Sequence, residues 1–391
     1  MDGARTYGDR PDGTDLVDTL AAVFAQRAAE YDRNASIGFD NLADLRAAGL
    51  LALAVPRAWG GEGADLGRVM DVVARIARAD PSTALILGMQ FIHSAGIAAS
   101  PLWPAAVRDE VLHSVVRTGA LINALRVEPE LGTPARGGIP ATRVRRVGGR
   151  WLLSGRKIFS TGSAALHWGI VWAATEEDTP RIGQILVPLN SPGVRIEKSW
   201  HHLGMRASGS DTIVFEDVDI PERYLIGFDA PVGAEREPPT VALWHVLVVP
   251  ALYNAIAQSA RDWLVAFLQN RVPTALGKPL STLTRFHAVL GEIDGLLLCN
   301  RALLEWGIGL EVNNANALSE GRQIKRLVTE NAITLVSRAV EVTGNPGLSQ
   351  DNPLERHYRD VLCGRVHTPQ ADAVLEQVGE RAFAAWRQNR A

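Results

Sequence analysis

The order in which sequence patterns change along the 391 residues constrains the fold most. Residues 16 to about 120 carry apolar side chains at helical spacing, as in Leu16, Leu20 and Phe24. Short β-rich runs bounded by glycine follow from residue 121, and long helical blocks return from about Pro238. This order predicts three domains, with bounds at 1–120, 121–235 and 236–391.

The central segment reads as a small β-domain. Its β-rich runs include Val144–Val147, Trp168–Ala174, Gln184–Pro188 and Asp211–Phe215. Closely spaced short strands joined by turns are typical of a barrel or a sandwich.

The C-terminal segment holds helical blocks longer than an average globular helix. Long helices joined by short loops predict a four-helix bundle. Pro250 interrupts the first block and should kink that helix or mark its true start. The blocks are Val241–Arg271, Ser281–Leu310, Ser319–Thr343 and one near Ala371–Asn389.

Composition excludes several classes of protein. The formal net charge of -3 favours neither nucleic acid nor an acidic membrane surface as a partner. Cys299 and Cys363 are too few for a disulfide framework and are wrongly spaced for a zinc site, so we expect no metal. No apolar run reaches the length that crosses a membrane, and the polar N-terminus is no signal peptide. We therefore expect a cytoplasmic protein without a membrane partner.

Three stretches carry a family likeness: residues 155–163 (GRKIFSTGS), 203–212 (LGMRASGSDT) and 352–360 (NPLERHYRD). They resemble motifs of the acyl-CoA dehydrogenase superfamily. The resemblance implies the acyl-CoA dehydrogenase fold: an N-terminal α-helical domain, a small central β-barrel domain and a C-terminal four-helix bundle. It also implies a flavin cofactor and a homotetramer.

The loop after Arg359-Asp360 departs from the dehydrogenase pattern. Dehydrogenases usually have Tyr-Glu-Gly-Thr in this loop, and its Glu removes a proton from the substrate. Here the Tyr position is His367, the Glu position is Thr368 and the Gly position is Pro369. A Thr hydroxyl cannot act as a base near neutral pH. The alternative base position of the family falls at or beside His245, which is either a substrate-pocket residue or an ordinary helix-face histidine.

A histidine in this loop resembles the two-component flavin monooxygenases of the dibenzothiophene type. The resemblance assigns catalytic roles to His367, His93 and Ser163, although His93 also fits a buried core histidine. It implies reduced flavin from a separate NAD(P)H:flavin reductase, O2, and oxidation of a small organic substrate at S, N or C through a C4a-hydroperoxyflavin. An acyl-CoA dehydrogenase or oxidase with a non-standard base is the alternative, and a relative without chemistry is the third possibility.

The same resemblance suggests which residues contact the flavin ring. Phe159 packs against the ring, and the hydroxyl of Ser160 or Thr161 donates to its polar edge together with adjacent backbone N–H groups. Val127 opens a stretch similar to "TEPxAGSD" that lines the ring.

Further family positions lie outside these stretches. Ser208, Ser210 and Thr368 fall on the substrate side. Arg271 corresponds to an arginine that reaches a flavin phosphate across a subunit interface. Thr343-Gly344 corresponds to a segment that packs the adenosine half of FAD, but the inserted Pro346 removes a backbone donor there. FMN is therefore favoured over FAD.

Overall fold

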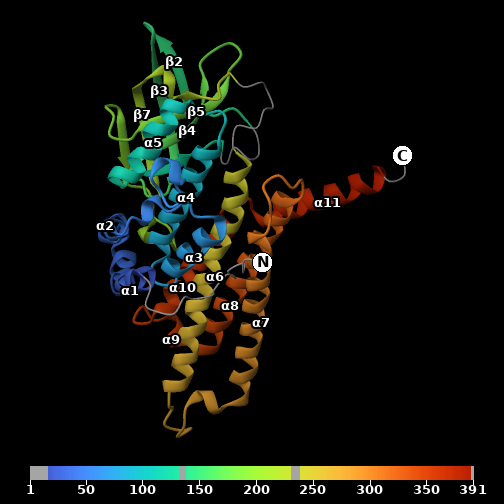
Figure 1. The fold of residues 1–391 in the computed structure, drawn as a ribbon. Coiled ribbons are helices and arrows are strands. Elements are labelled where there is room, and N and C mark those ends of the chain that lie inside the picture. The colour runs from blue at the N-terminus through green and yellow to red at the C-terminus, as the bar shows by residue number, and fades with distance from the viewer. Residues whose placement is uncertain (1–15, 132–137, 230–237, 389–391) are drawn as a thin grey trace.

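The computed structural model describes residues 16–131, 138–229 and 238–388. Helices form its first third (Figure 1). Helix α4 begins with Pro81 at its first position and is capped by Asp80, whose carboxylate accepts hydrogen bonds from the amides of Ser82 and Thr83. The helices are α1 (Leu16–Asn34), α2 (Phe39–Ala47), α3 (Leu66–Ala77), α4 (Pro81–Ala99) and α5 (Ala105–Thr118).

The predicted β-domain is confirmed, as one sheet of eight strands with the order β6-β7-β3-β2-β4-β5-β8 and with β1 paired to β4. Among the described residues no pairing joins the end strands β6 and β8, so a closed barrel is not seen. The strands are β1 (Leu121–Leu125), β2 (Arg143–Val147), β3 (Arg150–Ser160), β4 (Leu166–Thr175), β5 (Ile182–Pro188), β6 (Val194–Glu197), β7 (Asp211–Ile220) and β8 (Leu225–Ile226).

The C-terminal helical domain is also confirmed, with one correction to its membership. The fourth helix packed into the bundle is the short α10, which buries Leu354, His357 and Val361. The predicted fourth helix, α11, extends away from the body of the protein (Figure 1). The helices are α6 (Pro239–Asn270), α7 (Thr284–Ile308), α8 (Ala317–Thr343), α9 (Asn345–Leu348), α10 (Pro353–Leu362) and α11 (Ala371–Gln388).

Pro250 lies inside α6 and does not mark its start. Of the two outcomes predicted for Pro250, a helix start is therefore wrong, and a kink stays a prediction. The residues on both sides of Pro250 are buried in the core, so tertiary packing maintains the helix where a proline removes one hydrogen bond.

Helices α4 and α6 form the centre of the molecule. Both are long and apolar enough to cross a membrane, but 78% of each apolar window is buried inside the protein, as in core helices. The expectation that no apolar run reaches this length was wrong. The largest hydrophobic core joins the N-terminal helices to the bundle through these two helices, and a second core joins α5 to the sheet.

Candidate active site

The loop between α10 and α11 carries His367 to the surface of α6. The hydroxyl of Tyr253 on α6 and Nδ1 of His367 are 3.3 Å apart in hydrogen-bond geometry. The two rings meet edge-on, with centroids 5.6 Å apart. Tyr253 is fully buried, so the loop is seated on the core of the bundle.

A lysine on α8 also binds this loop. Nζ of Lys325 donates to the carbonyl oxygens of Gly364, His367 and Pro369, at 3.3, 2.6 and 3.0 Å. The residue is 2% exposed, and burial lowers the pKa of its ammonium to about 8.

Burial and, to a smaller extent, His245 and Lys325 lower the pKa of the His367 imidazole to about 3. No carboxylate is among the groups in the described part of the chain that shift this pKa. His367 is therefore neutral near pH 7. The next residue, half-buried Thr368, offers only a hydroxyl.

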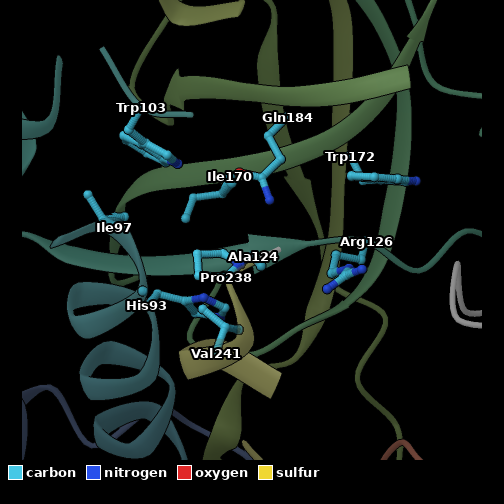
Figure 2. A pocket seen from close by; sticks show the side chains of 11 residues that line it. His93, Ile97, Trp103, Ala124, Arg126, Ile170, Trp172, Gln184, Pro238 and Val241 are labelled. Carbon is cyan, nitrogen blue, oxygen red and sulfur yellow. The ribbon is translucent and has the colours of Figure 1, made fainter. Parts of the chain in front are cut away.

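His93 lies on α4 and is 8% exposed. It faces a cavity of about 20 Å³ between α4, the sheet and the start of α6 (Figure 2). Trp172, Arg126 and Gln184 contribute to the wall on the sheet side. This volume holds about one water molecule. An organic substrate would need a wider opening.

The packing of α4 on α6 places His93 relative to His245. A Cβ atom on Gly88 would lie 3.3 Å from Val248, and one on Gly96 would overlap Val241. The two helices therefore run antiparallel. His93 lies alongside the segment of α6 that includes His245. The His93 region and the His367 loop therefore both pack against α6.

An exposed aromatic group stands at the end of β3. Phe159 is 52% exposed and has a left-handed backbone, with φ of 58°. Its ring meets Trp200 and His202 edge-on, with centroids 6.2 and 5.7 Å away, and those two rings are stacked. A strained backbone that presents an apolar ring to the outside is typical of a ligand site.

The loop after Phe159 is paired with the loop before β7. The amide of Gly162 donates to the carbonyl of Ser208 at 2.8 Å, and the amide of Ser163 donates to that of Gly209 at 3.0 Å. The amide of Thr161 donates to the carbonyl of Phe159. These N–H groups are occupied within the protein. That amides beside Phe159 donate to a flavin stays a prediction, and it would require these hydrogen bonds to rearrange.

Hydroxyl groups remain at this junction. Thr161 Oγ1 and Ser210 Oγ are 3.0 Å apart, and Ser210 Oγ and Ser208 Oγ are 2.8 Å apart. Ser208 and Ser210 are buried, whereas Thr161 is half-buried. Of these three residues, Thr161 is therefore the most exposed to solvent. Ser160 is 1% exposed, and its hydroxyl makes a long contact of 3.5 Å with the carbonyl of Lys157.

Ser163 and Val127 support the loop from within. Ser163 Oγ donates to Asp211 Oδ2 at 3.1 Å, and Ser163 is 1% exposed. The other oxygen of Asp211 accepts from the amides of Ser199 and Trp200. The carbonyl of Val127 accepts from the amide of Ile158 at 2.9 Å. The single proton of the Ser163 hydroxyl is therefore used to anchor the loop.

Three predicted cofactor residues lie far from Phe159 within one chain. Arg271 is exposed just after α6, Thr343 is the last residue of α8, and Gly344 follows it. Figure 1 shows these helix ends at the opposite end of the molecule from the sheet. The Thr343 hydroxyl donates to the carbonyl of Ala339 at 2.9 Å. A single chain does not bring these residues to the aromatic group.

The Arg359-Asp360 pair joins α10 to the loop before β7. Asp360 Oδ1 accepts from the amide of Met205 at 2.6 Å, and burial raises the pKa of Asp360 to about 7. Arg359 pairs with Asp32 and Glu355 at 2.6 and 2.7 Å. This motif therefore fixes the position of the bundle relative to the sheet.

Comparison with known proteins identifies the family. Family models for the N-terminal, middle and C-terminal domains of acyl-CoA dehydrogenase match residues 15–103, 126–218 and 248–370. "Putative acyl-CoA dehydrogenase YdbM" of Bacillus subtilis is 33% identical over 93% of this chain and 94% of its own length. The chain belongs to the acyl-CoA dehydrogenase family.

Two further relatives of this acyl-CoA dehydrogenase family member have names or bound ligands that indicate other reactions. L-evernosamine nitrososynthase of a Micromonospora species is 30% identical, over 92% of this chain and 87% of its own length. KijD3 was solved with FMN and dTDP-3-amino-2,3,6-trideoxy-4-keto-3-methyl-D-glucose. It is 28% identical, with a TM-score of 0.79, over 96% of this chain and 94% of that chain. The predicted family, fold, oxidoreductase class and flavin cofactor are confirmed by these comparisons.

The residues at the end of β3 fit a flavin in this acyl-CoA dehydrogenase family member. The ring of Phe159 is exposed and held in a strained conformation, which suits packing on a flat heterocycle. The Thr161 hydroxyl lies two residues away and can donate or accept. A bound flavin would supply the redox chemistry.

The sequence interpretation missed Tyr253 and Lys325. Tyr253 stands eight residues after His245 on α6, about two helical turns along. Lys325 occupies a core position of α8, next to Ile324 and four residues before Thr329, which are both buried. A lone lysine in an apolar stripe was a detectable signal, but a lysine on a helix is usually solvated.

Proposed function

We propose that this protein is a flavin-dependent monooxygenase that oxidises a small organic substrate at sulfur, nitrogen or carbon with O2. A separate NAD(P)H:flavin reductase would deliver the reduced flavin, with FMN favoured over FAD. One observation carries the proposal: the loop in which dehydrogenases of this family carry their Glu base has His367 and Thr368 instead, and the His367 ring lies in hydrogen-bond contact with Tyr253.

The proposed role of His367 follows from its contacts. Burial keeps the pKa of Tyr253 well above its usual range, so its hydroxyl stays protonated. When that hydroxyl donates to Nδ1, the imidazole proton of neutral His367 is on Nε2. His367 would then donate a hydrogen bond from Nε2 to an oxygen atom in the pocket. His93 would contact the substrate from α4.

An amine nitrogen is the first substrate class to test. Two relatives at 28 and 30% identity are a protein solved with FMN and a nucleotide-linked amino sugar, and a nitrososynthase. Arg126 and Gln184 at the small cavity are polar groups suited to a nucleotide-linked sugar.

The remote positions of Arg271, Thr343 and Gly344 support a homotetramer in which a second copy completes each flavin site. Within one chain these residues cannot reach a ring packed on Phe159.

The second candidate is an acyl-CoA dehydrogenase with a non-standard base. It is favoured by the 33% identity to YdbM, whose name denotes that activity. His367 or His245 would then have to accept the substrate proton, although positive neighbours and burial hold the pKa of His367 low.

The deciding experiment supplies reduced FMN or FAD from an added reductase, ¹⁸O₂ and a panel of amino sugars, thioethers and aromatic heterocycles. We expect a product that carries ¹⁸O, made with FMN faster than with FAD. A parallel anaerobic assay offers acyl-CoA thioesters with an electron-accepting dye. Dye reduction by a thioester, without ¹⁸O incorporation into any panel substrate, would overturn the monooxygenase proposal in favour of the dehydrogenase.

A further inference from the structure

Lys325 occupies a point where three backbone carbonyl groups of the His367 loop converge. Its ammonium donates to Gly364, His367 and Pro369 at 3.3, 2.6 and 3.0 Å. An ammonium group has three donors, so these bonds use all of them. The Gly364 carbonyl follows α10, where helix-end carbonyls lack partners within the helix.

The burial of this cation is costly, and no carboxylate among the described residues offsets it at contact distance. Burial is the largest cause that lowers the pKa of Lys325, and only Glu330 opposes it. Glu330 is itself paired with Arg326 at 2.7 Å on the exposed side of α8. The loop carbonyls therefore supply the compensation for a buried ammonium.

The loop also packs closely against both helices at Gly364. A Cβ atom on Gly364 would lie 2.6 Å from Cγ2 of Thr329 on α8 and 3.2 Å from the ring of Tyr253 on α6. The loop is thus packed against both α8 and α6, and it bonds to Lys325 on the first and Tyr253 on the second.

We propose that Lys325 is a positioning residue that clamps loop 364–369 through its backbone, so that the imidazole of His367 stays against Tyr253, and that its ammonium, 2.6 Å from the His367 carbonyl oxygen, adds to burial in disfavouring a positive charge on this imidazole. The catalytic consequence rests on the proposed function. The charged and titratable groups that face the imidazole are His245 and Tyr253 from α6 and Lys325 from α8. A proton on His367 would place a second cation beside Lys325.

The test separates the clamp from the charge. Lys325→Met removes both the hydrogen bonds to the loop and the positive charge. Lys325→Arg keeps the charge, on a planar group that cannot donate to all three carbonyls in the same way. Arg301→Met on α7 is the control for the loss of an exposed cation. Amide hydrogen exchange of the peptide 363–370 reports the clamp. Exchange of the imidazole C2 hydrogen of His367 against pH reports its protonation. Flavin affinity and kcat are measured in parallel.

In Lys325→Met we expect amide exchange in 363–370 to rise at least about tenfold, because three hydrogen bonds to a charged donor are lost. The titration midpoint of His367 should move upward, and kcat should fall at least about tenfold with flavin affinity within about twofold. Lys325→Arg should raise amide exchange while the midpoint stays low. Arg301→Met should match the wild type in every readout.

Unchanged exchange and an unchanged midpoint in Lys325→Met would overturn the inference. The wild type alone gives a second check if that variant does not fold. A His367 midpoint near the ordinary value of about 6.5 would contradict the proposed effect of the charge. A wild type that forms no oxygenated product defeats the proposed function, whereas the exchange data still decide the role of Lys325.

Discussion

At the scale of single residues, His367 carries the chemical argument because its neighbours are positive groups and a tyrosine. In His367→Ala, product formation should fall about 10²- to 10⁴-fold, the range expected when a positioned acid–base group is removed. Flavin affinity should stay within about twofold, since the aromatic group at Phe159 lies on the other domain. Stopped assays and fluorescence titration measure the two effects. His113→Ala on α5 is the control, and a fully active His367→Ala would remove His367 from the mechanism.

Phe159 gives a prediction with effects of opposite sign. Its left-handed backbone costs about 1–2 kcal/mol in a residue with a Cβ atom. Phe159→Gly should therefore unfold no more easily than the wild type without flavin, yet bind flavin about tenfold more weakly because ring packing is lost. Phe159→Ala should lose the same affinity without the relief of strain. Equal flavin affinity in all three proteins would refute the assignment of this ring to the cofactor.

His357 on α10 predicts a pH dependence of stability. It is 4% exposed, and burial lowers the pKa of its imidazole to about 3, whereas the unfolded chain binds a proton at about 6.5. This residue is neutral in the fold, so its contribution is full above pH 6.5 and is lost as the pH falls from 6.5 towards 3. Between pH 7 and pH 5 the loss is about 2 kcal/mol. Urea unfolding of His357→Gln should show a pH dependence smaller by this amount; an identical dependence would contradict the buried neutral state.

At the scale of elements, the loop between α10 and α11 depends on a glycine that allows close approach. Gly364→Ala would press its methyl group against Thr329 and Tyr253, so it should cost about 1–3 kcal/mol or release the loop. Gly379 on α11 is the matched control, because a Cβ atom there meets nothing within 4 Å. Gly379→Ala should stabilise the helix by about 0.5–1 kcal/mol. Thermal unfolding and activity of both variants test this, and a harmless Gly364→Ala would mean that the loop is not tightly seated.

The elements also show what the sequence could predict. The long blocks were found to within a few residues, since apolar periodicity over several turns is a strong signal. The fourth bundle helix was misassigned because α10 has only 10 residues, while α11 is longer and carries Phe383 and Trp386. Both of those side chains are exposed, at 69 and 58%, so their apolar character did not mean burial in one chain.

The site was predictable where a motif carried it and not where distant segments meet. His367 and Phe159 follow from aligned motifs. The amides of Gly162 and Ser163 bond to residues 208 and 209, more than forty positions along the chain. No local sequence pattern predicts this pairing.

At the scale of the whole molecule, Asp360 joins the bundle to the sheet. Asp360→Ala would leave the buried amide of Met205 without an acceptor, at a cost of about 1–3 kcal/mol, and loosen the loop that supports the Phe159 region. Asp360→Asn keeps an oxygen acceptor and should be mild. We expect flavin affinity to fall in the alanine variant and to persist in the asparagine variant. Equal flavin affinity in both variants would show that the bond between Asp360 and Met205 does not affect the residues proposed to bind flavin.

The occupied amides beside Phe159 have a consequence for redox cycling. A backbone N–H can only donate a hydrogen bond, whereas a hydroxyl group rotates and can either donate or accept one. Position N5 of a flavin accepts a hydrogen bond when the ring is oxidised and carries its own hydrogen when the ring is reduced. The amides are paired within the protein, and Thr161 and Ser210 are linked through their oxygens. The proposed flavin site would therefore offer rotating hydroxyl groups that suit either form of the ring.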